Sequence, residues 1–192
     1  VVVTSWAAND VTAGNLLGTA RPWYYTSLLN DDTNYSFKYP ADVLVMMMGQ
    51  RELIAGDLDG VQFEADMTTF LTDYIAANPT VPIYLVITND IQTSGLSWLP
   101  ASLVTLQAAF SANTTLLDVR QASGLSDWTT ADSNGYMYNN RYLNPTGQAV
   151  AWNYVGGLIL DDILATGVGF TGVLRNANTG ALIADETGIK CS

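Results

Sequence analysis

The stretch ADVLVMMMGQRE, from Ala41 to Glu52, decides the fold, because it joins an uninterrupted apolar run to a glycine turn. The apolar run extends from Val43 to Met48 and has no polar position, a pattern typical of a strand that is buried on both faces. Such strands occur mainly in parallel sheets that helices cover on both sides. The stretch therefore predicts an α/β fold with a turn at Gly49.

Helices and strands alternate in the sequence that follows. A helix is predicted over Phe63–Ile75, because apolar residues recur there at spacings of three and four, and Asn78-Pro79 ends the pattern. A second buried strand is predicted at Val81–Thr88, and a second helix begins at Pro100. This alternation requires crossover connections, so it predicts a doubly wound, mainly parallel sheet flanked by helices.

The second half of the chain continues this pattern and then changes. A third short strand is predicted at Leu116–Val119, a long irregular loop over one sheet edge at Arg120–Leu143, and a helix from Pro145 to a point before Gly167. In residues 168–192, two short apolar runs flank a turn and predict a β-hairpin. We therefore expect an α/β domain at 1–167 and a C-terminal hairpin or assembly tail at 168–192.

Composition excludes several classes of partner. Seven Lys and Arg residues against 18 Asp and Glu residues give a formal net charge of -11. A surface of that sign repels phosphate backbones and anionic lipids, so nucleic acid and membranes are not expected partners. Cys191 is the single cysteine, so no internal disulfide or cysteine-based metal cluster is expected, and no metal or cofactor is predicted. The abundance of Asn, Thr, Tyr and Trp favours an extracellular protein or part of a virion or surface assembly.

Two blocks of the chain resemble the SGNH or GDSL hydrolase family. The first is the strand PADVLV at residues 40–45 followed by Gly49-Gln50-Arg51-Glu52, which stands where the family has Gly-x-Asn-Asp. The second is Arg141-Tyr142-Leu143-Asn144-Pro145, which stands where the family has Asp-x-x-His and a proline. The resemblance covers residues 40–165 and implies the family's doubly wound fold, with its site at the carboxyl ends of the parallel strands.

The catalytic residues of that family are replaced by other residues in this sequence. Arg51 stands in place of the oxyanion-hole asparagine, and Arg141 and Asn144 stand in place of the aspartate and histidine. The whole sequence contains no histidine. Asparagine does not take up a proton near neutral pH and arginine stays protonated, so this pair would not activate a serine. The chain is therefore similar to a catalytically degenerate member of the family.

The family's first block, Gly-Asp-Ser after the first strand, has no clear match. Ser5, after the apolar residues Val1–Val3, is a weak candidate nucleophile. An equally good alignment places Val1–Ala8 on the second strand, which would leave the nucleophile strand missing. The two alignments remain open at this point.

The resemblance implies a remnant cleft or ligand-binding site at the strand ends. Three of its members have a simpler interpretation: Arg51 and Glu52 as a solvated pair, and Asn144, more strongly, as the cap of the helix that begins at Pro145. The long loop adds aromatic side chains that suit a sugar platform or a partner surface, or that pack locally on the sheet. The cleft residues are Gly49, Arg51, Glu52, Asp90, Arg141 and Asn144, and the aromatic contact residues are Trp128, Tyr136, Tyr138 and Tyr142.

Three functions follow from these residues. The first is a non-catalytic binding or assembly module of an extracellular or virion-type protein, with protein partners or copies of itself. The second is a serine esterase or acyl hydrolase on carbohydrate or lipid esters, in which Ser5 attacks and a carboxylate such as Glu52 or Asp90 replaces the histidine. That carboxylate would need burial to raise its pKa. The third is a carbohydrate-binding domain that kept the cleft.

Overall fold

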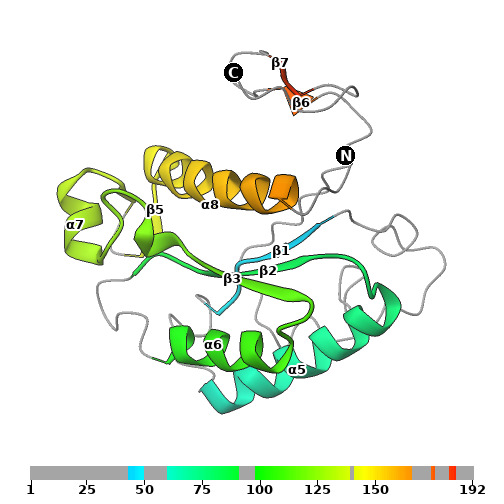
Figure 1. The fold of residues 1–192 in the computed structure, drawn as a ribbon. Helices are drawn as coiled ribbons and strands as arrows, with labels where there is room; N and C mark the ends of the chain where they lie inside the picture. Colours follow the sequence, from blue (N-terminus) through cyan, green and yellow to red (C-terminus); the bar gives the residue numbers. More distant parts are fainter. Residues whose placement is uncertain are drawn as a thin grey trace, which may run out of the picture.

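The central sheet is parallel and has three strands in the computed structural model shown in Figure 1. The structure describes residues 43–49, 60–90, 98–138 and 141–165, and the backbone of 174–175 and 182–184. The strands are β1 (Leu44–Met46), β2 (Ile83–Ile87) and β3 (Thr114–Asp118), in that spatial order. Both pairings are parallel, with Leu44 opposite Ile83 and Ile87 opposite Asp118.

Helices cover both faces of this sheet. Helices α5 (Gly60–Ala77) and α6 (Leu99–Ala109) connect the strands and lie together on one face. Helix α8 (Pro145–Ala165) lies on the opposite face (Figure 1). The prediction of an α/β fold with a parallel sheet flanked by helices is thus confirmed.

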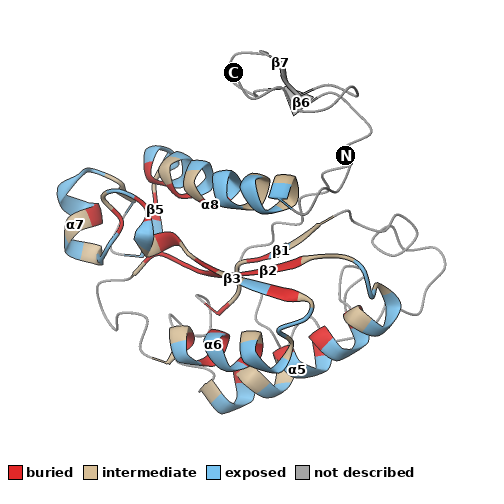
Figure 2. Cartoon of the chain, in the orientation of Figure 1, coloured by how far each residue is buried: buried red, intermediate tan, exposed pale blue. Residues whose placement is uncertain are grey.

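Strand β2 shows why the two layers form. All five of its residues are buried (Figure 2). Successive side chains of a strand point to opposite faces, so Ile83, Leu85 and Ile87 pack with α5 and α6. Tyr84 and Val86 point the other way and belong to the core cluster beneath α8. The apolar run of the sequence therefore supplies both cores at once, as predicted.

Strand β1 differs from its prediction. Its extent is three residues rather than the whole apolar run, and its burial is incomplete because Val45 is 36% exposed. The three methionines of the run still alternate, with Met46 and Met48 on the α5 side and Met47 on the α8 side. Met46 is the buried residue of the run, Val45 is exposed and the other four are half-buried, so the prediction of burial on both faces was wrong for most of this run.

The segment expected to be a long irregular loop contains regular structure. It holds a 3-10 turn η1 (Val119–Gln121), helix α7 (Trp128–Ser133) and two short antiparallel strands, β4 (Met137–Tyr138) and β5 (Tyr142–Leu143). The prediction was wrong because these elements begin at polar caps and have no apolar period. The Asp118 carboxylate accepts from the Arg120 amide, and the Asp127 carboxylate accepts from the Thr130 amide.

Two short strands near the C-terminus pair as the predicted hairpin requires. Strands β6 (Leu174–Arg175) and β7 (Leu182–Ala184) pair antiparallel, with Leu174 opposite Ala184. The predictions for Val1–Ala8 lie outside the described residues. Within the described part, no helix is long and apolar enough to cross a membrane.

Candidate functional site

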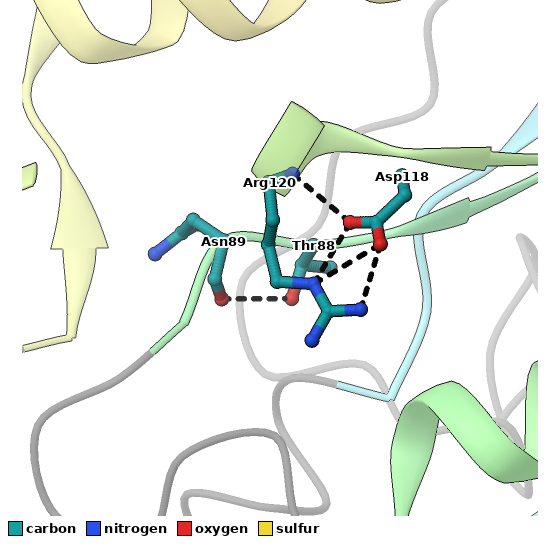
Figure 3. Close-up of polar contacts among 4 residues, drawn as sticks. All are labelled: Thr88, Asn89, Asp118 and Arg120. Atoms are coloured by element: carbon teal, nitrogen blue, oxygen red, sulfur yellow. Dashed lines mark hydrogen bonds and ion pairs between the residues drawn. The ribbon is translucent and has the colours of Figure 1, made fainter. Parts of the chain in front are cut away.

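The carboxyl ends of the three parallel strands bring polar residues to one edge of the sheet. Gly49 follows β1, Thr88, Asn89 and Asp90 follow β2, and Asp118 ends β3. Parallel strands end at the same edge, and this edge is where open α/β sheets bind ligands. Figure 3 shows the side chains that meet there.

An arginine and an aspartate at this edge are joined by several hydrogen bonds (Figure 3). The Arg120 Nε atom donates to Asp118 Oδ1 at 2.8 Å, and Nη2 donates to Oδ2 at 2.7 Å. The backbone amide of Arg120 also donates to Asp118 Oδ1, at 3.0 Å. The exposed fractions of the two side chains are 30% and 20%. The guanidinium is therefore held in one orientation at the end of β3 while part of it faces solvent.

A second carboxylate contributes to the electrostatics of this site. The pKa of Arg120 is raised chiefly by its hydrogen bond to Asp118, with smaller contributions from the charges of Asp118 and Asp90. Asp90 was among the predicted site residues, and its charge acts on Arg120. Asp118 and Arg120 were not among the predicted site residues. The feature that could have identified them is the sequence Asp118-Val119-Arg120 at the end of the predicted third strand.

Two buried polar residues complete the end of β2. Thr88 is 1% exposed and Asn89 is 6% exposed. The Thr88 hydroxyl donates to the carbonyl of Asn89 at 3.2 Å, and the Asn89 amide donates to the carbonyl of Asp90 at 2.9 Å. These bonds stabilise the backbone where the strand turns away from the sheet.

Gly49 has a structural reason to be glycine. Its φ angle is 98°, in the left-handed region, and a Cβ atom there would overlap the side chain of Leu99. The glycine therefore allows the chain to turn sharply beneath the start of α6. A ligand-binding role for Gly49 stays a prediction.

Asn144 caps α8, as its simpler interpretation predicted. Its Oδ1 atom accepts from the backbone amide of Gly147 at 3.0 Å. Its Nδ2 atom donates to the carbonyl of Gly135 at 2.6 Å. Its own backbone amide donates to the carbonyl of Tyr136 at 2.8 Å. Asn144 therefore joins the start of α8 to the turn that precedes β4.

Of the remaining predicted cleft residues and the candidate nucleophile Ser5, the structure describes only Arg141. Arg141 is exposed in the turn before β5, three positions ahead of Asn144. Ser5, Arg51 and Glu52 lie outside the described residues. The roles proposed for these four positions therefore stay predictions.

The four aromatic residues of the segment divide into two pairs. Trp128 and Tyr136 are half-buried, and Tyr136 packs against the core cluster beneath α8. Tyr138 and Tyr142 are 69% and 41% exposed. The interpretation of local packing therefore applies to Tyr136, whereas the rings of Tyr138 and Tyr142 are exposed to solvent.

In the described part of the chain, no group of three or more His, Cys, Asp or Glu side chains is arranged to hold a metal ion. No protein-family model and no curated protein sequence matches the chain.

A solved structure does share the fold. The chain is similar to a serine-to-alanine mutant of an acetyl esterase, crystallised with acetate ion, with a TM-score of 0.50 and 14% sequence identity. The match covers 82% of this chain and 70% of the esterase chain. An identity this low shows the fold alone. The chain therefore has a hydrolase-like α/β fold.

Proposed function

We propose that this chain is a ligand-binding domain on a hydrolase-like fold and that it does not hydrolyse its ligand. This would make it a degenerate relative of the SGNH hydrolases. The likeness to an acetyl esterase supports the hydrolase-like fold. The replacement of the family's catalytic residues supports the loss of hydrolysis.

The state of Asn144 is the observation that carries the proposal. This residue stands where the resemblance places the catalytic base, but its amide has no proton-accepting group near neutral pH. Both ends of the amide are also bound to backbone, Oδ1 to the Gly147 amide and Nδ2 to the Gly135 carbonyl. Asn144 therefore serves as a helix cap, and the sequence contains no histidine that could act as the base.

The charges at the strand ends favour a neutral ligand. One guanidinium, Arg120, lies under the influence of two carboxylates, Asp118 and Asp90. An anion would meet both carboxylates, and the Arg120 face that could attract it is already paired with Asp118. A ligand with hydroxyl groups can both donate to carboxylates and accept from a guanidinium. We therefore propose a neutral, hydroxyl-rich ligand.

A serine-reactive probe tests the absence of hydrolysis. The purified protein would be treated with a fluorophosphonate and its intact mass recorded, beside hydrolysis of 4-nitrophenyl acetate. We expect no adduct and no rate above that of the heat-unfolded protein, because unactivated hydroxyl groups do not react. A known serine esterase treated in parallel serves as the positive control.

The alternative function is an esterase with a carboxylate base, favoured by the likeness to an acetyl esterase. It requires a stoichiometric adduct at one serine in the same experiment. Peptide mapping would then identify the nucleophile, with Ser5 the first candidate. That result would overturn the proposal of a binding domain.

We further propose that the protein acts outside the cell or in a virion or surface assembly, with protein partners or other copies of itself. The composition supports this location, and the hairpin of β6 and β7 could supply the contact. Deleting residues 169–192 should then lower the number of copies per particle, obtained by dividing the mass from light scattering on a sizing column by the mass of one truncated chain. An unchanged number of copies per particle would show that the hairpin has no part in self-assembly.

A further inference from the structure

Two exposed tyrosines lie opposite each other on the small ladder of β4 and β5. Tyr138 pairs directly with Tyr142 across the antiparallel strands. Directly opposed residues project from the same face of a ladder, with Cβ atoms about 4.5–5.5 Å apart. Their exposed fractions of 69% and 41% leave both rings open to solvent.

The other pair of the ladder points inward. Met137 pairs with Leu143, and Leu143 is 8% exposed within the core cluster beneath α8. Met137 packs against the same cluster. One face of the ladder is therefore anchored in the core and the other carries the two tyrosines, so the aromatic pair has a fixed support.

Hydrogen bonds from Asn144 make this support rigid. Its backbone amide donates a hydrogen bond to the carbonyl of Tyr136, and its side-chain amide donates one to the carbonyl of Gly135. Both carbonyls lie just before β4. Gly147 lies so close beneath Tyr136 that an added Cβ atom would be 2.5 Å from the Tyr136 carbonyl oxygen. A binding surface that is already ordered loses little conformational entropy when a ligand arrives.

The size of the patch indicates a small occupant. One aromatic side chain can bury about 150–250 Å² when fully covered. Two partly exposed tyrosines therefore offer well under the roughly 800 Å² that each partner contributes to a stable protein interface. The patch suits a ring or two of a small ligand better than a folded protein.

The chemistry of the patch indicates what that ligand is. A tyrosine ring has an apolar face and a polar hydroxyl tip, which match a sugar ring with C–H groups on its faces and hydroxyls at its edge. The net charge of -11 opposes anionic ligands. We propose that Tyr138 and Tyr142 form a stacking platform for a neutral carbohydrate. This inference rests on the proposed binding function and names its ligand class.

Saturation-transfer NMR with neutral oligosaccharides tests the platform. Cellohexaose, xylohexaose, mannohexaose and maltohexaose would each be titrated against the intact protein. We expect transfer to the ring protons of at least one sugar. Tyr138→Ala and Tyr142→Ala should each weaken that binding by about tenfold, which corresponds to about 1.4 kcal/mol.

Matched variants separate ring stacking from other effects. Tyr138→Phe with Tyr142→Phe keeps both faces and should retain most of the affinity, whereas leucine at both positions should lose it. Trp152→Ala removes an aromatic that is 48% exposed on α8 and should leave binding unchanged. All these positions are exposed, so each variant should fold, as thermal unfolding would check.

Two results would overturn the platform. Native affinity in both alanine variants would place the sugar elsewhere, and no transfer to any of the four sugars would exclude the ligand class. The fluorophosphonate experiment tests hydrolysis separately, and neither of these binding results changes its outcome. Failure of the platform is therefore distinguishable from failure of the non-hydrolytic function.

Discussion

The two faces of the sheet are held in different ways. On the α5 and α6 face, large apolar side chains fill the core, including Phe63, Met67 and Leu71, each 0% exposed. On the other face, the buried residues of α8 are small, namely Gly147, Ala151 and Val155. Individual polar side chains support that helix at both ends, Asn144 at its start and Asp162 near its finish. One face therefore depends on packed volume and the other also depends on single hydrogen bonds.

The largest effect should come from emptying the packed face. Phe63→Ala removes a fully buried ring that lies 5.2 Å from the ring of Trp98. We expect it to lower the free energy of unfolding by about 3–5 kcal/mol, measured by urea denaturation. Val61→Ala, at a position 77% exposed on the same helix, should change it by less than about 0.5 kcal/mol. Equal effects of the two substitutions would contradict the assignment of this core.

A smaller loss should follow from removing the cap of α8. Asn144→Ala deletes the acceptor for the Gly147 amide and the donor to the Gly135 carbonyl, so we expect a loss of about 2 kcal/mol. Asn144→Asp keeps the acceptor for the Gly147 amide but sets a carboxylate oxygen against the Gly135 carbonyl, so it should not recover the whole loss. Asn153→Ala, at an exposed position in the same helix, is the control and should be nearly neutral. If Asn144→Ala were as mild as Asn153→Ala in denaturant unfolding, the cap would have no energetic role.

The far end of α8 offers a third comparison. Tyr84, 2% exposed on β2, donates to Asp162 Oδ2 at 2.7 Å. Tyr84→Phe should therefore lower the free energy of unfolding by about 1–2 kcal/mol. Tyr154→Phe, at a half-buried tyrosine of the same helix, should change it by less than about 0.5 kcal/mol.

The same bond predicts a dependence on alkaline pH. Burial, and then the hydrogen bond to Asp162, raises the pKa of Tyr84. Its folded pKa lies above the unfolded value of about 10, so this stabilisation is fully present below that pH and is lost as the pH rises through the folded pKa. Thermal unfolding should show a steeper alkaline decline for the native protein than for Tyr84→Phe. Parallel curves would contradict this sign.

The smallest effect concerns the cap of α7. Hydrogen bonds from the Thr130 amide, the Thr130 hydroxyl and the Ser126 hydroxyl, in that order, lower the pKa of the exposed Asp127 carboxyl. Its stabilisation should be present above the unfolded value of about 3.9 and be lost as the pH falls through the folded pKa. Carbon NMR titration should place the Asp127 midpoint below that unfolded value. Ser126→Ala should move the midpoint part of the way back, and an unmoved midpoint would exclude this contact.

The accuracy of the sequence predictions follows the same division between packing and hydrogen bonding. The helix over Phe63–Ile75 and the strand over Val81–Thr88 were correct in kind because their apolar periods are local properties of the chain. The segment 120–143 was predicted as irregular, since a two-residue strand and a capped single turn have no detectable period. Asn144 was correctly expected to cap a helix because it directly precedes a helix-starting proline.

The site was predictable only in part. Asp90 could be identified as a candidate site residue because it follows a recognisable strand. Arg120 follows the third predicted strand and could have been identified in the same way. The sequence could not predict which aromatic residues are buried and which are exposed. It does not show that Tyr136 packs on the core while Tyr138 and Tyr142 oppose each other across a ladder. This difference depends on the register between β4 and β5.

By itself, the sequence determined the α/β class, the parallel sheet, the absence of a histidine base and the acidic surface, because periodicity and composition do not depend on how the chain packs. Tertiary structure decided which polar groups meet. Tyr84 and Asp162 are 78 positions apart, and the bond from Asn144 to Gly135 spans 9. Such contacts exist only after the apolar faces have brought α8 onto the sheet, and a hydrogen bond depends on distance and angle.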